Sequence, residues 1–586
     1  APSTTSGSTS TLSAAQITTL LADASLTSTT TNIQNLVNYL RGDKTNEGTD
    51  SGKFRVRNHR LGDIVDSTPV SGTSITDSRK FVIVGANDGM VHIFDAATGN
   101  EIFAYMPSIP TAVNSYHPSV AALAKQNYSH QFYVNGGISL TKVTSGGTTK
   151  LIAIGTLGQG GQTVYALDLT DLSSPTATTN LLWEFTDPEL GYTGGTPSIV
   201  TLKDGTKAAV FGNGYNNTQA DGSASTTGNA SIFVVNALDG TLISRLDTKV
   251  GASADPLTKS RANAMAQPVV LADNVYSSSG VRKAKAIYAG DLFGNLWKWN
   301  IDDTDSTKWA PGLGTTASPL PIFVAKDANN NIQPITTRPS LAMHASANGV
   351  MVLFGTGKYV ESTDNTYDLP TSGTPTTFGI QSFYGIRDYK DNVGIGSLIS
   401  RSDLKQRVIT AEIKIGDNYK RLIDTSSDMV TLPAAIDWST KKGWYLDLSN
   451  SSAEILGTGA AAKSVNGERS VTNSSVSLQK LAFTTLIPGT DVCAGTNSGW
   501  SMELNASEGT LYVPLTKVVN LEDESTISYL TSQKNTNGIL SSPSKVYSND
   551  GNAVHSVNQV VSSNGDVVTT TGDTITSKQE SWKQAY

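Results

Sequence analysis

The strongest constraint on the fold is a phrase of two apolar runs joined by a short polar turn. Its clearest copy is FVIVGANDGMVHIFDAATG, residues 81–99. The runs are rich in β-branched and aromatic residues and flank Asn87-Asp88-Gly89, a combination typical of a β-hairpin. The second run ends at Asp95 and is followed by a turn that finishes at Gly99. The phrase therefore predicts a hairpin with an exit turn.

Related phrases recur along the chain, and the recurrence predicts a repeated sheet. Because a small antiparallel sheet cannot bury both faces alone, such sheets stack on one another, and a ring of them is a propeller. The copies follow one another at roughly 68 residues on average, whereas a plain blade needs about 40 to 45. We therefore expect a mostly β fold, a seven-bladed β-propeller with long loop insertions. The seven copies close at Asp95, Asp168, Asn236, Asn300, Arg387, Asp447 and Asn505.

The chain outside these phrases differs in composition. Its first residues are rich in Ser and Thr, which is typical of an interdomain linker, so we expect a fragment of a longer protein. Two apolar patterns with helical spacing follow, and Ser13 and Thr31 are the expected N-caps. The expected order is a linker, short helices leading into the propeller, propeller blades, and closing strands or a cap: residues 1–12, 13–53, 54–510 and 511–586.

Charge and cysteine content exclude several classes of protein. The net charge is -7 and the basic residues are scattered, which does not favour a nucleic-acid partner. The densest basic cluster, Arg55, Arg57, His59 and Arg60, alternates with other residues and favours a polar strand face over a phosphate groove. A single cysteine, Cys493, excludes an internal disulfide and a multi-cysteine metal site. No apolar run approaches 18 residues, so we expect no transmembrane segment.

Several phrases in a fixed order resemble one protein family. They are RLGDIVDSTPV (60–70), VGANDGMVHIFDAATGNEIFAYMPS (84–108), HQFYVNGG (130–137), YAGDLFGNLWKWNID (288–302), VLFGTGKYVE (352–361), QSFYGIRD and GWYLDL. Together they resemble the C-terminal domain of the PilC/PilY proteins, which are type IV pilus biogenesis factors and tip adhesins. The resemblance covers residues 35 to 510 approximately. It implies a modified seven-bladed propeller.

The resemblance also implies a non-enzymatic surface domain that supports pilus assembly against retraction, twitching motility and adhesion. The implied partners are major or minor pilins, and a host cell surface or extracellular matrix. The implied location is the pilus tip or outer-membrane surface of a Gram-negative bacterium. Two alternatives stay open: a quinoprotein dehydrogenase, whose blades share a D-x-x-T-G turn, and a propeller scaffold of the outer membrane. No GxSxG elbow and no histidine pair with ligand spacing indicates catalysis.

Calcium is the one cofactor that the resemblance brings into consideration. Several family members carry an acidic D-x-D-x-D-G loop, in which alternate carboxylates bind the ion. The corresponding stretch here, ADNVYSSSGVRKAKA, keeps only Asp273, so we expect that site to be lost. Two other clusters of oxygen ligands are calcium candidates, although a hairpin turn and a solvated loop explain them as well. They are Asp327, Asn329 and Asn331, and Asp302, Asp303 and Asp305.

Arg41-Gly42-Asp43 spells the triplet that integrins recognise, and some relatives are linked to integrin binding through such a triplet. The triplet follows a helical pattern, where Gly ends a helix for backbone reasons. We therefore favour a framework role for Gly42 and keep integrin binding as the alternative. Cys493 lies in a polar loop, where we expect an ordinary thiol and keep an intermolecular partner as the alternative.

Overall fold

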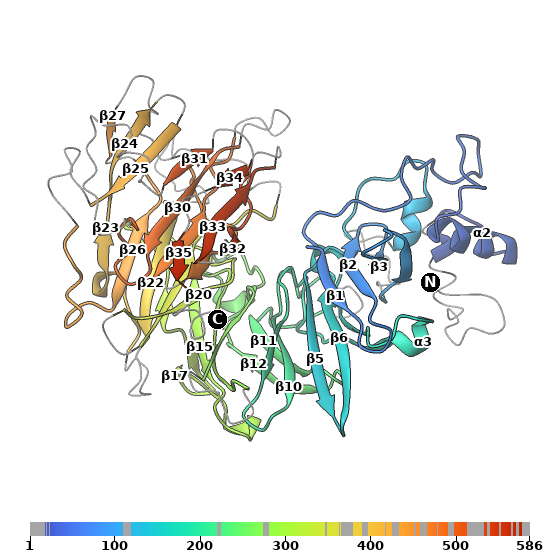
Figure 1. The fold of residues 1–586 in the computed structure, drawn as a ribbon, viewed down its shortest axis with the longest axis horizontal. Coiled ribbons are helices and arrows are strands. Elements are labelled where there is room, and N and C mark those ends of the chain that lie inside the picture. Colours follow the sequence, from blue (N-terminus) through green and yellow to red (C-terminus); the bar gives the residue numbers. More distant parts are fainter. Residues whose placement is uncertain are drawn as a thin grey trace. The chain divides into compact units, whose positions relative to one another are not determined.

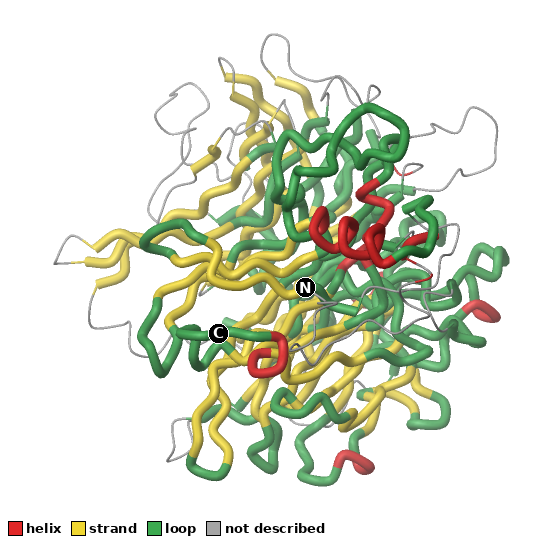
Figure 2. Tube along the Cα trace, turned by 90° about the vertical axis from the view of Figure 1, so that its right-hand side faces the viewer, coloured by secondary structure: helices red, strands yellow, loops and turns green. Residues whose placement is uncertain are grey.

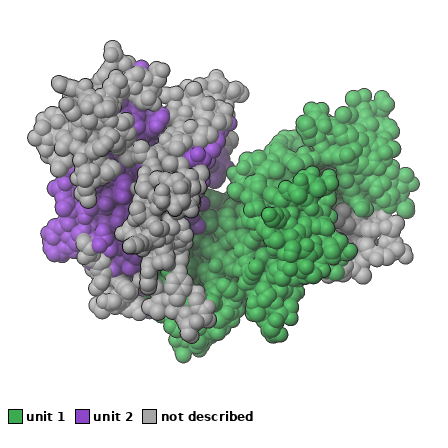
Figure 3. All heavy atoms as spheres, in the orientation of Figure 1, with its two compact units in different colours: residues 1–287, 299–310 green, residues 288–298, 311–586 purple. Residues whose placement is uncertain are grey.

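The computed structural model describes residues 18–576 apart from a set of gaps. The gaps are 19, 23, 109–118, 220–223, 274–280, 346–348, 362–363, 365–378, 389–396, 416–417, 425–432, 451–452, 457–465, 478, 490–496, 513–531, 536–538, 550–552, 564–566 and 570–572. The chain divides into two compact units, residues 1–287 with 299–310 and residues 288–298 with 311–586 (Figure 3).

Strands make up most of the regular structure, and helices are few and short (Figure 2). The predicted helix before the first sheet is present as α2 (Thr30–Leu40). Its N-cap is Thr29, whose hydroxyl accepts the Asn32 N–H at 3.1 Å, so the expectation of Thr31 is wrong by two residues. The other expected cap, Ser13, and the linker 1–12 lie outside the described residues.

The first unit contains successive four-stranded antiparallel sheets (Figure 1). In each, the strands follow one another in chain order, which is the arrangement of a propeller blade. The first sheet is β1 (Val70–Thr73), β2 (Lys80–Ala86), β3 (Met90–Asp95) and β4 (Glu101–Tyr105). The second is β5 (Ile138–Ser145), β6 (Thr148–Thr156), β7 (Val164–Asp168) and β8 (Leu181–Phe185). The third is β9 (Ser198–Thr201), β10 (Lys207–Gly212), β11 (Ser231–Asn236) and β12 (Leu242–Asp247).

A fourth sheet has the same order and carries one extra strand. It is β13 (Val269–Ala272), β14 (Ala284–Gly290), β15 (Asn295–Asn300) and β16 (Ala310–Pro311), with β19 (Phe323–Val324) on β15.

The second unit has two further sheets that contain the repeated phrase. One has the order β20 (Ser340–Met343), β21 (Val350–Gly355), β22 (Ser382–Asp388), β26 (Gly443–Asp447) and β23 (Lys405–Arg407). The other is β28 (Ser475–Ser477), β29 (Lys480–Thr484), β30 (Gly499–Asn505) and β31 (Gln533–Asn535). Smaller sheets are formed by β24 (Ile409–Ile415), β25 (Asn418–Ile423) and β27 (Glu454–Leu456), by β17 (Leu313–Gly314) and β18 (Pro319–Leu320), and by β32 (Ser544–Asn549), β33 (Ala553–Val561), β34 (Val567–Thr569) and β35 (Asp573–Thr576).

The seven phrases correspond to six sheets in the part of the chain that the structure describes. The phrases that close at Arg387 and Asp447 lie in neighbouring strands, since β22 pairs with β26 and Ser382 opposes Asp447. Counting them as separate repeats was wrong, because the long insertion between these strands hides their pairing. The copies therefore do not establish seven blades.

Both faces of the central strands are buried, and this explains their continuous apolar runs. On β6, Leu151 and Ala153 belong to one core cluster, together with Phe81 and Ile83 of β2. The alternate residues Ile152 and Ile154 belong to a second cluster, together with Phe211 and Phe233 of the third sheet. Side chains alternate between the faces of a strand, so each inner strand supplies two cores at once.

The exit turn of the phrase is closed by the same backbone hydrogen bond in three copies. The side-chain oxygen of Asp95 accepts the N–H groups of Ala97 and Thr98, both at 2.9 Å. The closing residue of the turn, Gly99, donates to the Asp95 carbonyl at 2.8 Å and has φ 73°. Gly240 and Gly509, at φ 75° and 68°, likewise donate to the carbonyls of Asn236 and Asn505. The Asn505 side chain accepts two turn N–H groups and the Asn236 side chain accepts one. A positive φ explains the Gly in each copy.

A charged group is fully buried in the second unit. The Arg421 guanidinium on β25 lies 2.9 Å from a Glu412 carboxylate oxygen and makes two 2.7 Å bonds to Glu468. It also stacks over the Trp500 ring at 4.0 Å. Their side chains are at most 1% exposed, and Thr485 donates to Glu468 at 2.7 Å. This ion cluster is stable only because each carboxylate is paired and hydrogen-bonded.

Replacing Arg421 with Met tests this dependence. The change leaves two buried carboxylates without their cation, so we expect the free energy of unfolding to fall by about 3 to 5 kcal/mol. Urea unfolding, followed by the fluorescence of the second unit, measures this free energy. Lys441→Met is the control, because the ammonium of this half-buried lysine donates at the surface to the Ser402 carbonyl at 2.9 Å. Equal losses in the two variants would show that the buried cation is not needed.

Candidate functional site

A cavity of about 310 Å³ lies in the first unit beside the first hairpin. It is lined by the end of α2, by segment 55–63, by the hairpin turn Asn87-Asp88, and by Leu123, Tyr128 and His130. The segment runs past the hairpin without belonging to a sheet. A concave surface with several charged groups is the usual form of a binding site, so this groove is the candidate site.

Segment 55–63 is attached along one of its two edges. The Arg55 N–H donates to the Ala124 carbonyl at 2.9 Å, and its own carbonyl accepts the Tyr39 hydroxyl at 3.1 Å. Two residues later the Arg57 N–H donates to Glu47 at 3.1 Å, and its carbonyl accepts the Lys44 ammonium at 2.8 Å. Alternate residues thus hold residues 55–57 in an extended conformation against the protein, and the chain then bends at Asn58, Arg60 and Leu61.

Arg57 is a structural residue and does not belong to a polar surface. Its side chain is 9% exposed, its Nε lies 2.7 Å from a Glu47 carboxylate oxygen, and its guanidinium stacks 3.6 Å above the Tyr39 ring. Burial raises the pKa of Glu47, but hydrogen bonds from Arg57 outweigh burial and lower that pKa overall. The expectation of a polar strand face over Arg55, Arg57, His59 and Arg60 is therefore wrong for Arg57.

The hairpin turn of the opening phrase forms one end of the groove. The structure confirms the predicted hairpin: β2 pairs with β3 up to Ala86 and Met90, and Gly89 has φ 92°. The Asp88 carboxylate accepts the Gly62 N–H at 2.9 Å, and the Asn87 N–H donates to the Asp63 carbonyl at 3.0 Å. The turn thus fixes the position of segment 62–63.

His92 on β3 supports Asp88 from behind. Its Nε2 lies 3.1 Å from Asp88 and its Nδ1 lies 2.7 Å from Glu101, while the ring stacks on Phe94. Burial alone lowers the pKa of His92, but the hydrogen bonds and charges of the two carboxylates outweigh it and raise the pKa to about 9. His92 is therefore protonated at neutral pH and donates to both carboxylates.

The Arg41-Gly42-Asp43 triplet lies where α2 ends. The Gly42 N–H donates to the Tyr39 carbonyl and the Asp43 N–H to the Asn38 carbonyl, both at 2.9 Å, and Gly42 has φ 98°. This is a Schellman C-cap, which agrees with the framework role for Gly42. Hydrogen bonds from Thr45 lower the pKa of the Asp43 carboxyl. Integrin recognition stays a prediction.

The calcium candidate Asp327 lies in a tight hairpin turn. Its carboxylate accepts the N–H groups of Asn329 and Asn331 at 2.8 and 2.9 Å and the Asn331 side-chain amide at 2.9 Å. Asp291 makes the same bonds to its own turn, which ends at Asn295. The fourth residue has a positive φ in both turns, Asn330 at 64° and Gly294 at 81°. The geometry thus favours the turn interpretation.

The second calcium candidate does not bring its carboxylates together around one point. Asp302 pairs with Lys203 at 2.7 Å, whereas Asp303 accepts the Asp305 N–H at 2.9 Å. Asp305 caps the short helix η4 (Ser306–Lys308) through the Thr307 N–H at 3.0 Å. In the described part of the chain, no group of three His, Cys, Asp or Glu side chains has the geometry of a metal site.

Asp273 does not belong to the groove. Asp273 forms an ion pair with Lys285 at 2.8 Å, and the loop that follows it, 274–280, lies outside the described residues. Cys493 also lies outside them.

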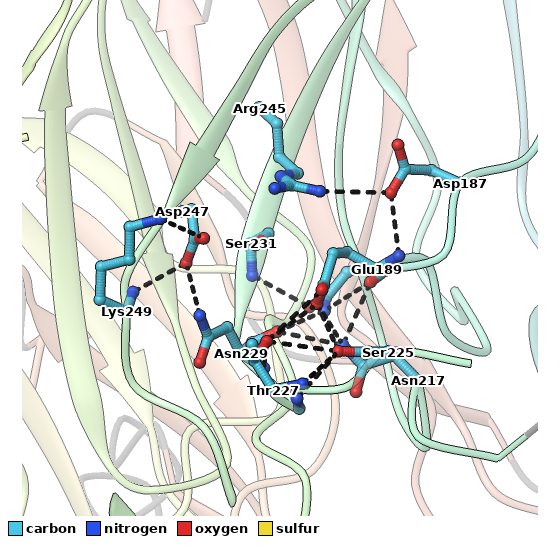
Figure 4. Close-up of polar contacts among 12 residues, drawn as sticks. Asp187, Glu189, Asn217, Ser225, Thr227, Asn229, Ser231, Arg245, Asp247 and Lys249 are labelled. Atoms are coloured by element: carbon cyan, nitrogen blue, oxygen red, sulfur yellow. Dashed lines mark hydrogen bonds and ion pairs between the residues drawn. The ribbon is translucent and has the colours of Figure 1, made fainter. Parts of the chain in front are cut away.

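Sequence reasoning missed a polar network around Glu189 in the first unit (Figure 4). The Glu189 carboxylate accepts the hydroxyls of Ser225 at 2.6 Å and Thr227 at 3.3 Å. Asn217, which is fully buried, donates to the Glu189 carbonyl at 3.2 Å. The network holds the described part of the insertion between β10 and β11 against segment 187–189. No sequence motif predicts this network, because the residues that form it are up to 38 positions apart.

The charge on His92 predicts a pH-dependent stability. The pKa is raised from 6.5 to about 9 on folding, so the stabilisation is complete below pH 6.5 and is lost as the pH rises through 9. We expect about 2 kcal/mol, allowing for screening at the half-exposed Glu101. The measurement is the difference in unfolding free energy between the native protein and His92→Gln at pH 6 and pH 10.

The control is His130→Gln, since His130 is half exposed and pairs with Asp63 at the surface. That change should leave the pH dependence almost intact. If His92→Gln also leaves it intact, His92 does not carry the effect.

Comparison with known proteins identifies the fold. The family model for the PilY1 beta-propeller domain matches residues 66–415. A type IV pilus biogenesis factor PilY1 homolog of Xylella fastidiosa is 32% identical over 514 residues, which are 81% of this chain and 31% of the relative. The type IV pilus biogenesis factor PilY1 of Pseudomonas aeruginosa strain PAK is 32% identical over 521 residues, 81% of this chain and 40% of the relative.

A solved structure agrees with these relatives. The crystal structure of the Pseudomonas aeruginosa PilY1 C-terminal domain superposes with a TM-score of 0.57 at 25% identity, and the match covers 84% of this chain and 93% of that one. The mostly β propeller fold is thereby confirmed, and so is the resemblance found in the sequence. The chain spans less than half the length of the two curated relatives. It belongs to the PilY1 β-propeller domain family.

Proposed function

We propose that this chain is the propeller of a type IV pilus biogenesis factor and that it supports pilus assembly as a non-enzymatic binding domain. The family match over residues 66–415 is the observation that carries the proposal. The two curated relatives are named as type IV pilus biogenesis factors and match 81% of this chain. Because the chain spans only 31% and 40% of those relatives, the proposal concerns the propeller part of such a factor.

The propeller acts by binding other proteins through its surface segments. Its inner strands are buried in cores on both faces, so recognition falls to the loops and outer segments. The partners are major or minor pilins, and their binding favours pilus extension over retraction. Twitching motility follows from pilus function, and adhesion to a host surface or matrix is a further role of the same loops.

We place the domain outside the cell, at the pilus or on the outer surface of a Gram-negative bacterium. The two relatives come from Gram-negative bacteria and are pilus factors by name. Within the described residues, no helix has the length and apolar character needed to span a membrane.

Deleting the gene in its own organism tests the proposed role. We expect the deletion strain to lose surface pili, and to regain them when the motor that retracts pili is also removed, because the protein opposes retraction. Electron microscopy and a sheared-pilin assay measure this. Restoring the complete gene is the control. Normal piliation in the single deletion strain would refute the proposal.

We also propose that Lys285 replaces calcium at Asp273. Its ammonium lies 2.8 Å from Asp273 and 3.7 Å from Asp302, so it supplies positive charge between two carboxylates. A protein with this ion pair needs no metal there. Without the lysine, the two carboxylates would repel each other and would attract a hard cation.

A thermal unfolding experiment tests the replacement. We expect the unfolding midpoint of the native protein to be the same in EDTA and in calcium, because only a ligand that binds the folded state raises it. Lys285→Ala should lower the midpoint in EDTA and make it rise on addition of calcium. Lys142→Ala, an exposed lysine on β5, is the matched control. A calcium response of the native protein would contradict the proposal, and Asp327→Asn and Asp303→Asn would then locate the ion.

A further inference from the structure

Exposed apolar side chains concentrate on one segment beside the groove. Four of the eleven large apolar residues that are exposed in the described part of the chain lie within ten residues of one another. They are Val56 and Val65, each 54% exposed, Ile64 at 41% and Leu61 at 40%. Scattered exposed apolar residues are normal, whereas a cluster marks an interaction surface.

The backbone of the same segment has an open edge. Arg55 and Arg57 use both their N–H and carbonyl groups on the protein side. The backbone of Val56 between them, and that of residues 58–61 beyond, makes no hydrogen bond with any residue that the structure describes. In an extended chain, neighbouring residues direct their backbone groups to opposite sides. Up to the bend at Asn58, the outer side of this segment therefore has backbone groups at Val56 and Asn58 that no described residue pairs with.

The charges beside this edge are positive. Arg55 stacks 4.7 Å from the centre of the Tyr128 ring, and its Nε donates to the Leu123 carbonyl at 2.9 Å. Arg60 is exposed. Within the described residues, neither arginine has a carboxylate within 4 Å. The charge of Arg60 does contribute to lowering the pKa of Asp43. The acid on this side of the groove, Asp63, is already paired with His130 at 2.9 Å.

We propose that residues 55–58 are the docking edge for an extended, acidic strand of another protein. The partner strand pairs with the open backbone at Val56 and Asn58, which is recognition by β-strand addition. Its acidic side chains lie against Arg55 and Arg60, and its apolar side chains cover Val56 and Leu61. The positive edge selects against a basic strand and against a second copy of the same edge.

Rigid support makes this edge suitable for docking. The inner side is fixed by Arg57, which is clamped between Glu47 and the Tyr39 ring. The far end is fixed at Gly62 by Asp88. A pre-ordered strand loses little conformational freedom when a partner strand pairs with it. Assigning that strand to a pilus subunit rests on the function proposed above, whereas the preference for an acidic strand does not.

The test begins with a random library of ten-residue peptides selected on the complete chain. We expect the recovered peptides to be acidic with alternating apolar residues. Methylating the backbone nitrogens that face the edge should abolish binding, while methylating the alternate nitrogens should not. Fluorescence anisotropy of the labelled peptides measures both. Recovery of no peptide, of basic peptides, or of peptides insensitive to methylation would overturn the proposal.

Variants of the chain locate the binding. Arg60→Glu should weaken peptide binding by about tenfold, since it turns an attraction at the rim into a repulsion. Lys142→Glu makes the same change of charge on β5 and should have no effect. Val56→Pro removes one outward N–H and should also weaken binding, with a thermal melt to show that the fold persists. Equal binding to Arg60→Glu and the native chain would overturn the proposal.

The same variants separate this inference from the proposed function. Loss of pili in a strain that carries Arg60→Glu, with normal pili for Lys142→Glu, would identify the docked strand as one used in pilus assembly. Normal pili with lost peptide binding would keep the docking edge and remove its assignment to a pilus subunit. Binding of an oligonucleotide instead of peptides at Arg60 would refute the edge itself.

Discussion

Burial of both faces of the inner strands is the constraint on which the rest of this structure depends. Leu151 and Ala153 of β6 lie in one core while Ile152 and Ile154 lie in the next, so the second sheet depends on a neighbour on each side. Outer strands are less buried: β4 and β12 have exposed or half-exposed residues at most positions. The repeated phrase is the sequence form of this constraint, and it leaves recognition to outer strands and insertions.

The polar residues of the phrase serve the turns, and this explains why they resemble ion ligands. Asp95, Asn236 and Asn505 all accept backbone N–H groups of the turn that follows them. Asp and Asn are interchangeable in this role, because a neutral N–H group needs only an oxygen acceptor. A calcium site would instead favour carboxylates. The bonds around Asp327 follow the turn pattern seen at Asp291.

Local structure was predictable from the sequence and pairing over long distances was not. The hairpin at Asn87, the exit turn at Gly99 and the helix end at Gly42 depend on neighbouring residues, so their patterns were sufficient. The pairing of β22 with β26 spans an insertion of more than 50 residues, and two phrases were counted as two repeats. The burial of Arg421 has no local signal either, because its partner Glu468 is 47 residues away. The groove was hidden for the same reason, since its lining comes from five separate segments.

The turn residues of the first hairpin also position a neighbouring segment. Asn87 and Asp88 form the turn and also hold the Asp63 carbonyl and the Gly62 N–H, and His92 and Glu101 support Asp88 from the sheet. A Cβ atom at Gly62 would collide with the Asp88 backbone, so the approach needs glycine. The same repeat that builds the scaffold thus positions segment 55–63, in which the outward backbone of Val56 has no partner among the residues that the structure describes. An unpaired strand edge can pair with a strand of any sequence, and the arginines beside this edge favour an acidic partner strand.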